Sequence, residues 1–189
     1  MERLYSRRDL ARFAALALAV SAVPAAQARG RSIIIYYTRT GTNEGIARAL
    51  QGLVGNAPLL RLEERDRYAR DYDAMTDIAR AEVEAWKRRE LKTAIPDLSG
   101  YRNVFILSPL WWGHYSVPMR TFLMDHPLEG KRVFPVATSA SSPASGITSD
   151  LAKLLPKADV KKVLLIHTAD ASNPEAALKG WLSREGFNK

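Results

Sequence analysis

The feature that most constrains the fold is an alternation of short apolar runs with longer segments of helical periodicity, which begins at Ser32. The first run, residues 33–37, is apolar throughout, as is typical of a parallel strand buried on both faces. Parallel strands need long crossovers, usually helices, so the pattern predicts an α/β fold with a parallel sheet between two layers of helices. The expected strands are residues 33–37, 59–62, 103–108, 132–137 and 163–166, and the expected helices are residues 43–54, 68–90, 147–155 and two that begin at Pro118 and Pro174.

The composition agrees with one globular domain, expected over residues 29–189. The chain has 189 residues, of which 47% are apolar, and this is enough to bury a full core. It contains no cysteine, which excludes disulfides, thiolate metal sites and cysteine nucleophiles. The three histidines, His114, His126 and His167, show no metal-ligand spacing, so no metal site is expected.

The chain is basic, with a formal net charge of +8. Residues 1–28 hold four arginines and two acidic residues, which leaves 24 basic against 18 acidic residues, a net charge of +6, for the remainder. A basic surface can attract nucleic acid, anionic lipid or an acidic protein. Here the positive residues are scattered and not interleaved with aromatic ones, so we expect a solvated basic surface and no nucleic-acid partner.

The first 28 residues have the features of a cleaved signal peptide. The segment Ser6-Arg7-Arg8-Asp9-Leu10 precedes an alanine-rich apolar run over residues 13–23, and Ala26-Gln27-Ala28 has the small-x-small pattern of a cleavage site. The apolar run is shorter than the roughly 20 residues that span a bilayer, so we expect no stable membrane anchor. Arg29 is then the first residue of the mature protein.

The paired arginines of this leader resemble a twin-arginine signal, which exports proteins that have already folded. Leu10 and Ala11 stand where such signals more often have Phe and Leu, so an ordinary secretory leader is the alternative. Either kind of leader predicts export, and the twin-arginine kind predicts a folded protein in the bacterial periplasm.

A hydroxyl-rich loop, Thr38-Arg39-Thr40-Gly41-Thr42-Asn43, lies between the first expected strand and the first expected helix, which Asn43 is expected to cap. Hydroxyl groups and backbone N–H groups can converge on an anion in such a loop. The N-terminus of the helix adds a partial positive charge. The loop is therefore typical of a site for a phosphate monoester, although a plain polar turn is the simpler alternative.

Two more unusual loops are expected at the same edge of the sheet. Pro109-Leu110-Trp111-Trp112-Gly113 follows the third strand, and a Ser/Ala-rich loop that begins at Thr138 follows the fourth. In open α/β sheets, ligands bind at the carboxyl ends of the strands, where the strand order reverses. The three loops are therefore expected to border one ligand site.

Together these loops resemble those of the flavodoxin family, in particular bacterial flavodoxins that carry a Pro-x-Trp-Trp-Gly loop. The resemblance covers roughly residues 32–182. It implies a flavodoxin-like three-layer sandwich with a five-stranded parallel sheet of order 2-1-3-4-5, and non-covalently bound flavin mononucleotide (FMN) as the cofactor. The cofactor-binding residues that it implies are Thr38, Arg39, Thr40, Gly41, Thr42, Asn43, Pro109, Leu110, Trp111, Trp112, Gly113, Thr138, Ser139, Ala140 and Ser141.

In this interpretation the first loop surrounds the phosphate, and the tryptophan loop borders the flavin ring. A tryptophan face offers a large flat surface for an aromatic ligand, but adjacent residues of an extended chain point in opposite directions. We therefore expect only one of Trp111 and Trp112 to stack on the ring. His114 and Tyr115 follow this loop and could reach the flavin edge or a substrate, whereas His126 is expected to be structural.

Three functions remain open at this point. The first is an electron-transfer flavoprotein, in which the flavin does the chemistry for a redox partner protein or a small electron acceptor. The second is an FMN-dependent reductase of quinones or nitro compounds. The third is a binding protein of the same fold without flavin, because the third loop has Ala140 and Ser141 where related loops are often rich in glycine and the surface is basic.

Overall fold

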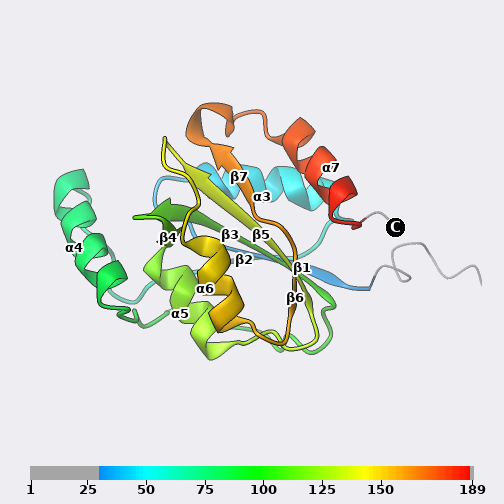
Figure 1. The fold of residues 1–189 in the computed structure, drawn as a ribbon, viewed down its shortest axis with the longest axis horizontal. Coiled ribbons are helices and arrows are strands. Elements are labelled where there is room, and N and C mark those ends of the chain that lie inside the picture. Colours follow the sequence, from blue (N-terminus) through cyan, green and yellow to red (C-terminus); the bar gives the residue numbers. More distant parts are fainter. Residues whose placement is uncertain (1–29, 188–189) are drawn as a thin grey trace, which may run out of the picture.

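A parallel sheet forms the centre of the protein, seen in a computed structural model that describes residues 30–187 (Figure 1). The order of its strands is β2-β1-β3-β5-β6, with β7 also paired to β5, which confirms the predicted order 2-1-3-4-5. The expected leader and Arg29 lie outside the described residues. The strands of the parallel sheet are β1 (Ser32–Tyr36), β2 (Leu59–Arg61), β3 (Asn103–Trp111), β5 (Arg132–Ser139), β6 (Asp159–Val160) and β7 (Leu164–His167).

The fifth position of the sheet is filled by two short strands in place of the single one predicted. β6 pairs with the start of β5, and β7 pairs with its end, from Val136 to Ser139. Between them, Lys161 N donates to Val133 O over 2.8 Å. β6 was not predicted because it is only two residues long and one of them, Asp159, is exposed and polar.

Helices cover both faces of the sheet (Figure 1). Because successive residues of a strand point to opposite faces, the apolar run of β1 supplies both cores: Ile33 and Ile35 face one layer, and Ile34 and Tyr36 the other. The second core also contains Phe105 of β3, which stacks on a phenylalanine of β5 with centroids 4.7 Å apart. One layer consists of α3 (Thr42–Leu53) and α7 (Glu175–Arg184), and the other of α5 (Val117–Asp125) and α6 (Ile147–Leu154).

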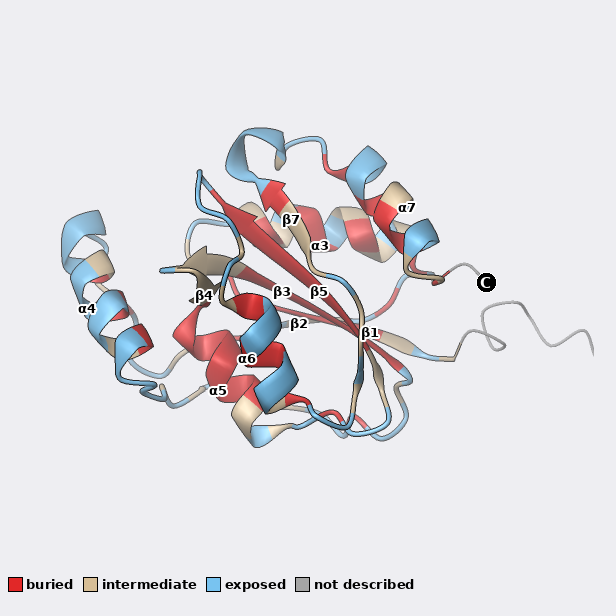
Figure 2. Ribbon diagram, viewed as in Figure 1, coloured by how far each residue is buried: buried red, intermediate tan, exposed pale blue. Residues whose placement is uncertain are grey.

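The remaining helix, α4 (Tyr72–Glu84), stands beside the sheet with most of its surface exposed (Figures 1 and 2). It is shorter than the predicted helix over residues 68–90. Asp71 caps its start by accepting a hydrogen bond from Ala74 N over 2.8 Å. After its end the chain turns at Trp86, which has a φ of 50°, and Arg65 N then donates to Glu90 O over 2.8 Å. A local cap and a pairing with the segment after β2 therefore set its length.

Arg120 of α5 holds the C-terminus of α4 against the body of the protein. Its side chain is fully buried, and its two terminal nitrogens donate to Val83 O and Glu82 O, each over 3.2 Å. The last carbonyl groups of a helix have no intrahelical donor and attract positive charge. Burial lowers the pKa of Arg120, and the guanidinium lies 4.8 Å from the ring centroid of Trp86. This buried side chain thus helps to position a helix of which only Met75, Ala79 and Val83 are buried.

Replacing Arg120 with methionine is expected to destabilise the protein by about 2 kcal/mol, because Val83 O and Glu82 O would lose their charged donor and keep only the backbone donors Trp86 N and Lys87 N. Thermal or urea unfolding measures the loss. Arg48→Met is the matched control: Arg48 is exposed on α3 and paired with Glu44 four residues before it, so its loss is expected to be under about 0.5 kcal/mol. Equal destabilisation by both variants would contradict the assignment.

Candidate functional site

The tryptophan segment is a β-hairpin and not the loop that was predicted. β3 continues through Trp111 and returns as β4 (His114–Tyr115), with Leu110 paired to Tyr115. Trp112 and Gly113 form the two-residue turn, with φ of 51° and 85°. Two positive φ values are typical of a type I′ turn, whose twist matches that of the strands. The pairing across this turn therefore extends β3 beyond its predicted end at residue 108.

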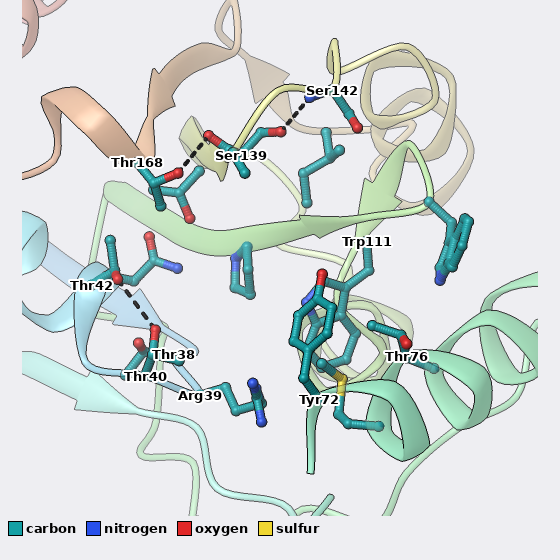
Figure 3. A pocket seen from close by; sticks show the side chains of 18 of the residues that line it. Thr38, Arg39, Thr40, Thr42, Tyr72, Thr76, Trp111, Ser139, Ser142 and Thr168 are labelled. Carbon is teal, nitrogen blue, oxygen red and sulfur yellow. Dashed lines mark hydrogen bonds between the residues drawn. The ribbon is translucent and has the colours of Figure 1, made fainter. Parts of the chain in front are cut away.

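The carboxyl ends of β1, β3 and β5 surround a cavity of about 350 Å³ (Figure 3). Residues of all three predicted loops line it, so the structure brings together segments that are up to about 100 residues apart. Gly41 and Gly113 do not line the cavity and shape the turns beside it, with φ of 93° and 85°. The predicted residues that line it are Thr38, Arg39, Thr40, Thr42, Asn43, Pro109, Leu110, Trp111, Trp112, Thr138, Ser139, Ala140 and Ser141.

One wall of this cavity was not predicted from the sequence. Tyr72, Met75, Thr76 and Ala79 of α4 line it, opposite the first loop and beside the hairpin (Figure 3). Met75 and Ala79 belong to the apolar stripe of α4, which by itself indicates only a buried helix face. Thr168 also lines the cavity and directly follows β7. Its position at the carboxyl end of a strand could have indicated from the sequence that it lies at the site.

The first loop presents polar groups around the start of α3. Thr38 Oγ1 accepts a hydrogen bond from Gly41 N over 2.9 Å, and the hydroxyls of Thr40 and Thr42 lie 3.2 Å apart (Figure 3). No side chain caps α3, so the N–H groups of its first turn keep no side-chain acceptor. Hydroxyl donors and a helix N-terminus at one point can bind an anion.

The predicted cap by Asn43 is wrong, because Gly41 occupies the N-cap position in the left-handed conformation. Asn43 lies within the first turn and is buried. Its amide nitrogen donates to Tyr37 O over 3.1 Å, and its amide oxygen is buried without a partner. The side chain therefore ties β1 to α3 and leaves one acceptor free beside the cavity.

Arg39 is the one charged side chain among the described residues that line the cavity. Its Nη1 donates to Arg70 O over 3.2 Å, and its guanidinium lies 5.8 Å from the ring centroid of Tyr72. These contacts hold a positive charge between the first loop and α4 (Figure 3). The electrostatics of the cavity thus favour an anion at this end.

The aromatic wall is rigid at Trp111 and open at Trp112. Trp111 meets Tyr37 and Tyr68 edge to face, with centroids 5.8 and 5.1 Å away. The phenol of Tyr68 donates to Glu82 over 2.5 Å, and burial together with that carboxylate raises the pKa of Tyr68, so the phenol stays protonated. Trp112 is 51% exposed. That only one of the two tryptophans stacks on a flavin ring remains a prediction.

Hydrogen bonds hold the start of the third loop. The Oγ of Ser139 accepts a hydrogen bond from Ser142 N over 2.8 Å, and Ser139 O accepts one from Thr168 over 3.2 Å (Figure 3). Thr138 and Ser139 are buried at the end of β5, whereas Ala140 and the residues after it are exposed. The cavity therefore has a fixed polar edge here and an exposed rim.

His114 and Tyr115, which from the sequence could reach the flavin edge or a substrate, lie outside the cavity lining. Tyr115 is buried under the sheet and donates to Val136 O over 3.1 Å. His114 Nδ1 lies 2.6 Å from Asp150 Oδ2, and Asp150 is buried in α6. The ring of His126 stacks on Phe122 at 5.0 Å, as a structural residue would.

Contact with α6 fixes the turn of the hairpin. Gly146 N donates to Gly113 O over 2.9 Å. A Cβ atom on Gly146 would lie 2.6 Å from His114 Cε1 and 2.9 Å from Gly113 O, closer than real Cβ contacts. The hairpin and α6 can therefore meet only because residue 146 has no side chain, and this contact sets the position of Trp112.

Gly146→Ala is expected to destabilise the protein by about 1–3 kcal/mol, because the added methyl overpacks the contact with His114. A shift in tryptophan fluorescence should accompany the loss, since the hairpin must move. Gly52→Ala provides the control: Gly52 lies in α3, where an added Cβ meets nothing within 4 Å, and alanine should stabilise the helix by about 0.5–1 kcal/mol. Unchanged stability and fluorescence in Gly146→Ala would refute this role.

No group of three or more His, Asp or Glu side chains in residues 30–187 is placed to hold a metal ion. Within the same range, no helix has the length and apolar character needed to cross a membrane.

Comparison with known proteins agrees with this geometry. The flavodoxin family profile matches residues 31–185. Among solved structures, a candidate flavoprotein from Bacteroides eggerthii is 26% identical, with a TM-score of 0.72 over 83% of this chain and 98% of that one. A flavoprotein from Lactobacillus acidophilus in complex with FMN is 20% identical, with a TM-score of 0.68 over 80% of this chain and 98% of that one. No curated protein sequence gives a significant match.

The fold and the cavity at its strand ends thus define a flavodoxin-like α/β protein. Since the family profile covers most of the chain, the protein belongs to the flavodoxin family.

Proposed function

We propose that this protein binds FMN non-covalently in the cavity and transfers electrons through it. The observation that carries the proposal is the convergence of the first loop, the hairpin and the third loop on one cavity at the carboxyl edge of the sheet. The Lactobacillus acidophilus relative, which has the same fold, was crystallised with FMN. Membership of the flavodoxin family supports the same cofactor.

The residues present fit FMN in volume and in the arrangement of polarity. A cavity of about 350 Å³ lies within the ~300–1,000 Å³ that small-molecule sites occupy. One end has threonine hydroxyls, the N-terminus of α3 and Arg39, which suit a phosphate dianion. The middle has Trp111 and Met75, which suit a flat ring, and the unpartnered oxygen of Asn43 can accept from a hydroxyl of the ribityl chain.

The chain's own groups would position the cofactor and control its surroundings. Thr40 and Thr42 donate to the phosphate, and Arg39 supplies the positive charge. The rigid Trp111 surface excludes water from one side of the ring, and a low-dielectric environment disfavours added negative charge on the ring. When bound, FMN supplies reversible uptake of one or two electrons.

The electron donor and acceptor are proposed as a class only: a redox partner protein or a small acceptor. The exposed side chains of Trp112 and Tyr72, 51% and 64% accessible, stand at the mouth of the cavity. They leave the site approachable from solvent, which an electron carrier requires. Turnover of a quinone with a nicotinamide donor alone would instead identify the protein as a reductase.

FMN added to the purified mature protein should give a yellow complex and quench its tryptophan fluorescence. Thr40→Val should weaken FMN binding about tenfold, since one hydrogen bond to a charged phosphate is worth about 1.5–3 kcal/mol, and should weaken riboflavin binding less than twofold. Fluorescence titration with both ligands gives the two dissociation constants.

Thr148→Val serves as the control, because Thr148 is an exposed threonine of α6 away from the cavity, and its FMN affinity should equal that of the wild type. Equal losses of FMN and riboflavin in Thr40→Val would show that the first loop does not hold the phosphate. A colourless protein with unchanged fluorescence would refute the proposed function.

For residues 1–28 we propose a cleaved twin-arginine leader that exports the folded protein to the periplasm. Such a route suits a protein that acquires its cofactor before crossing the membrane. Replacing Arg7 and Arg8 with lysines should leave the protein uncleaved in the cytoplasm, as cell fractionation and the N-terminal sequence of the product would show. If the lysine variant is still exported and cleaved between Ala28 and Arg29, the leader is an ordinary secretory signal instead.

A further inference from the structure

A second hollow, of about 280 Å³, lies on the other side of the first loop. It shares Thr38 and Arg39 with the cavity described above, so these two residues form the wall between the two spaces. Its lining also includes the buried Tyr37, Leu62 and Tyr68. The hollow is therefore a direct neighbour of the proposed phosphate end of the FMN site.

The lining of this hollow carries more positive than negative charge. Four arginines, Arg39, Arg61, Arg67 and Arg70, face two glutamates. Both glutamates already have partners. Glu64 accepts hydrogen bonds from Tyr37 OH at 3.2 Å and Tyr68 N at 3.4 Å. Glu63 lies 4.0 Å from Arg61 and 3.9 Å from a lysine.

Three of the four arginines have no carboxylate partner among the described residues. Arg67 and Arg70 are exposed and form no ion pair in this part of the chain, and Arg39 donates only to the carbonyl of Arg70. Like charges gathered around one hollow repel each other, and a bound anion relieves that repulsion. Guanidinium groups bind phosphate particularly well, because their planar fork matches its oxygens.

This excess of charge is separate from the needs of the FMN phosphate. Neutral hydroxyls, the start of α3 and Arg39 suffice for one dianion in the first loop. Arg67 and Arg70 line only the second hollow. We propose that this hollow is a second phosphate subsite, which takes a nucleotide phosphate while the first loop holds the flavin phosphate. The proposal rests on the proposed function for the position of that first phosphate.

A nucleotide phosphate can reach this subsite from two sources. It can be joined to the flavin itself, as in flavin adenine dinucleotide, whose second phosphate directly follows the first. It can also belong to a separate nucleotide that binds beside FMN. The volume of the hollow, close to the lower limit of ~300 Å³ for ligand sites, suits part of a nucleotide and not a whole dinucleotide.

Calorimetric titration of adenosine diphosphate into the protein, with and without saturating FMN, tests the subsite. The double variant Arg67→Ala/Arg70→Ala should weaken adenosine diphosphate binding about tenfold and FMN binding less than twofold. The matched control is Lys179→Ala/Arg184→Ala, which removes the same charge from exposed positions of α7 and should behave as the wild type. Equal weakening in both double variants, or no binding by the wild type, would overturn the proposal.

A parallel titration with flavin adenine dinucleotide identifies the source. If the second phosphate is joined to the flavin, the dinucleotide should bind more tightly than FMN, and the Arg67→Ala/Arg70→Ala variant should abolish the difference. If it belongs to a separate nucleotide, adenosine diphosphate should bind to the FMN-loaded protein. The titration of adenosine diphosphate without FMN separates this proposal from the proposed function. It measures nucleotide binding to the second hollow whether or not the protein binds FMN.

Discussion

The parallel pairing of β3 with β1 on one side and β5 on the other is the constraint on which the rest of the structure depends. In register, Tyr36 lies beside Leu107, and Pro109 lies beside Thr138. The strands therefore end at one edge, and the segments that follow them must meet there. Because each strand is buried on both faces, a shift of one residue would send apolar side chains to the wrong layer. The register that builds the core thus also assembles the cavity.

The parts that complete the cavity are attached to this frame by a few specific contacts. Arg120 fastens the end of α4 through two carbonyl groups, so α4 can form a wall of the site although little of it is buried. Gly146 permits α6 to press against the turn of the hairpin. Trp111 of the hairpin connects it to α4, because Trp111 packs against Tyr68 and lies next to the α4 residue Met75. The aromatic wall is consequently more rigid than its position at a sheet edge suggests.

Part of the chain's positive charge is concentrated beside the first loop. A net charge of +8 in the sequence indicates only a basic surface. In the fold, Arg39, Arg67 and Arg70 gather beside the first loop without carboxylate partners among the described residues, although they are up to 31 positions apart in the chain. Positive charge is therefore concentrated at the end of the site where phosphate is proposed to bind, which favours an anionic ligand there.

The sequence by itself determined the order of strands and helices, the buried strands and the three loops at one edge, because periodicity and apolar runs are local properties. Tertiary structure alone decided the rest. The extent of α4, the hairpin beyond Pro109 and the division of the fifth strand depend on pairing between distant segments, which no local pattern records. The buried position of Asn43 and the α4 wall of the cavity follow from packing. Local propensity thus identifies the elements, while the geometry of a site depends on which elements meet.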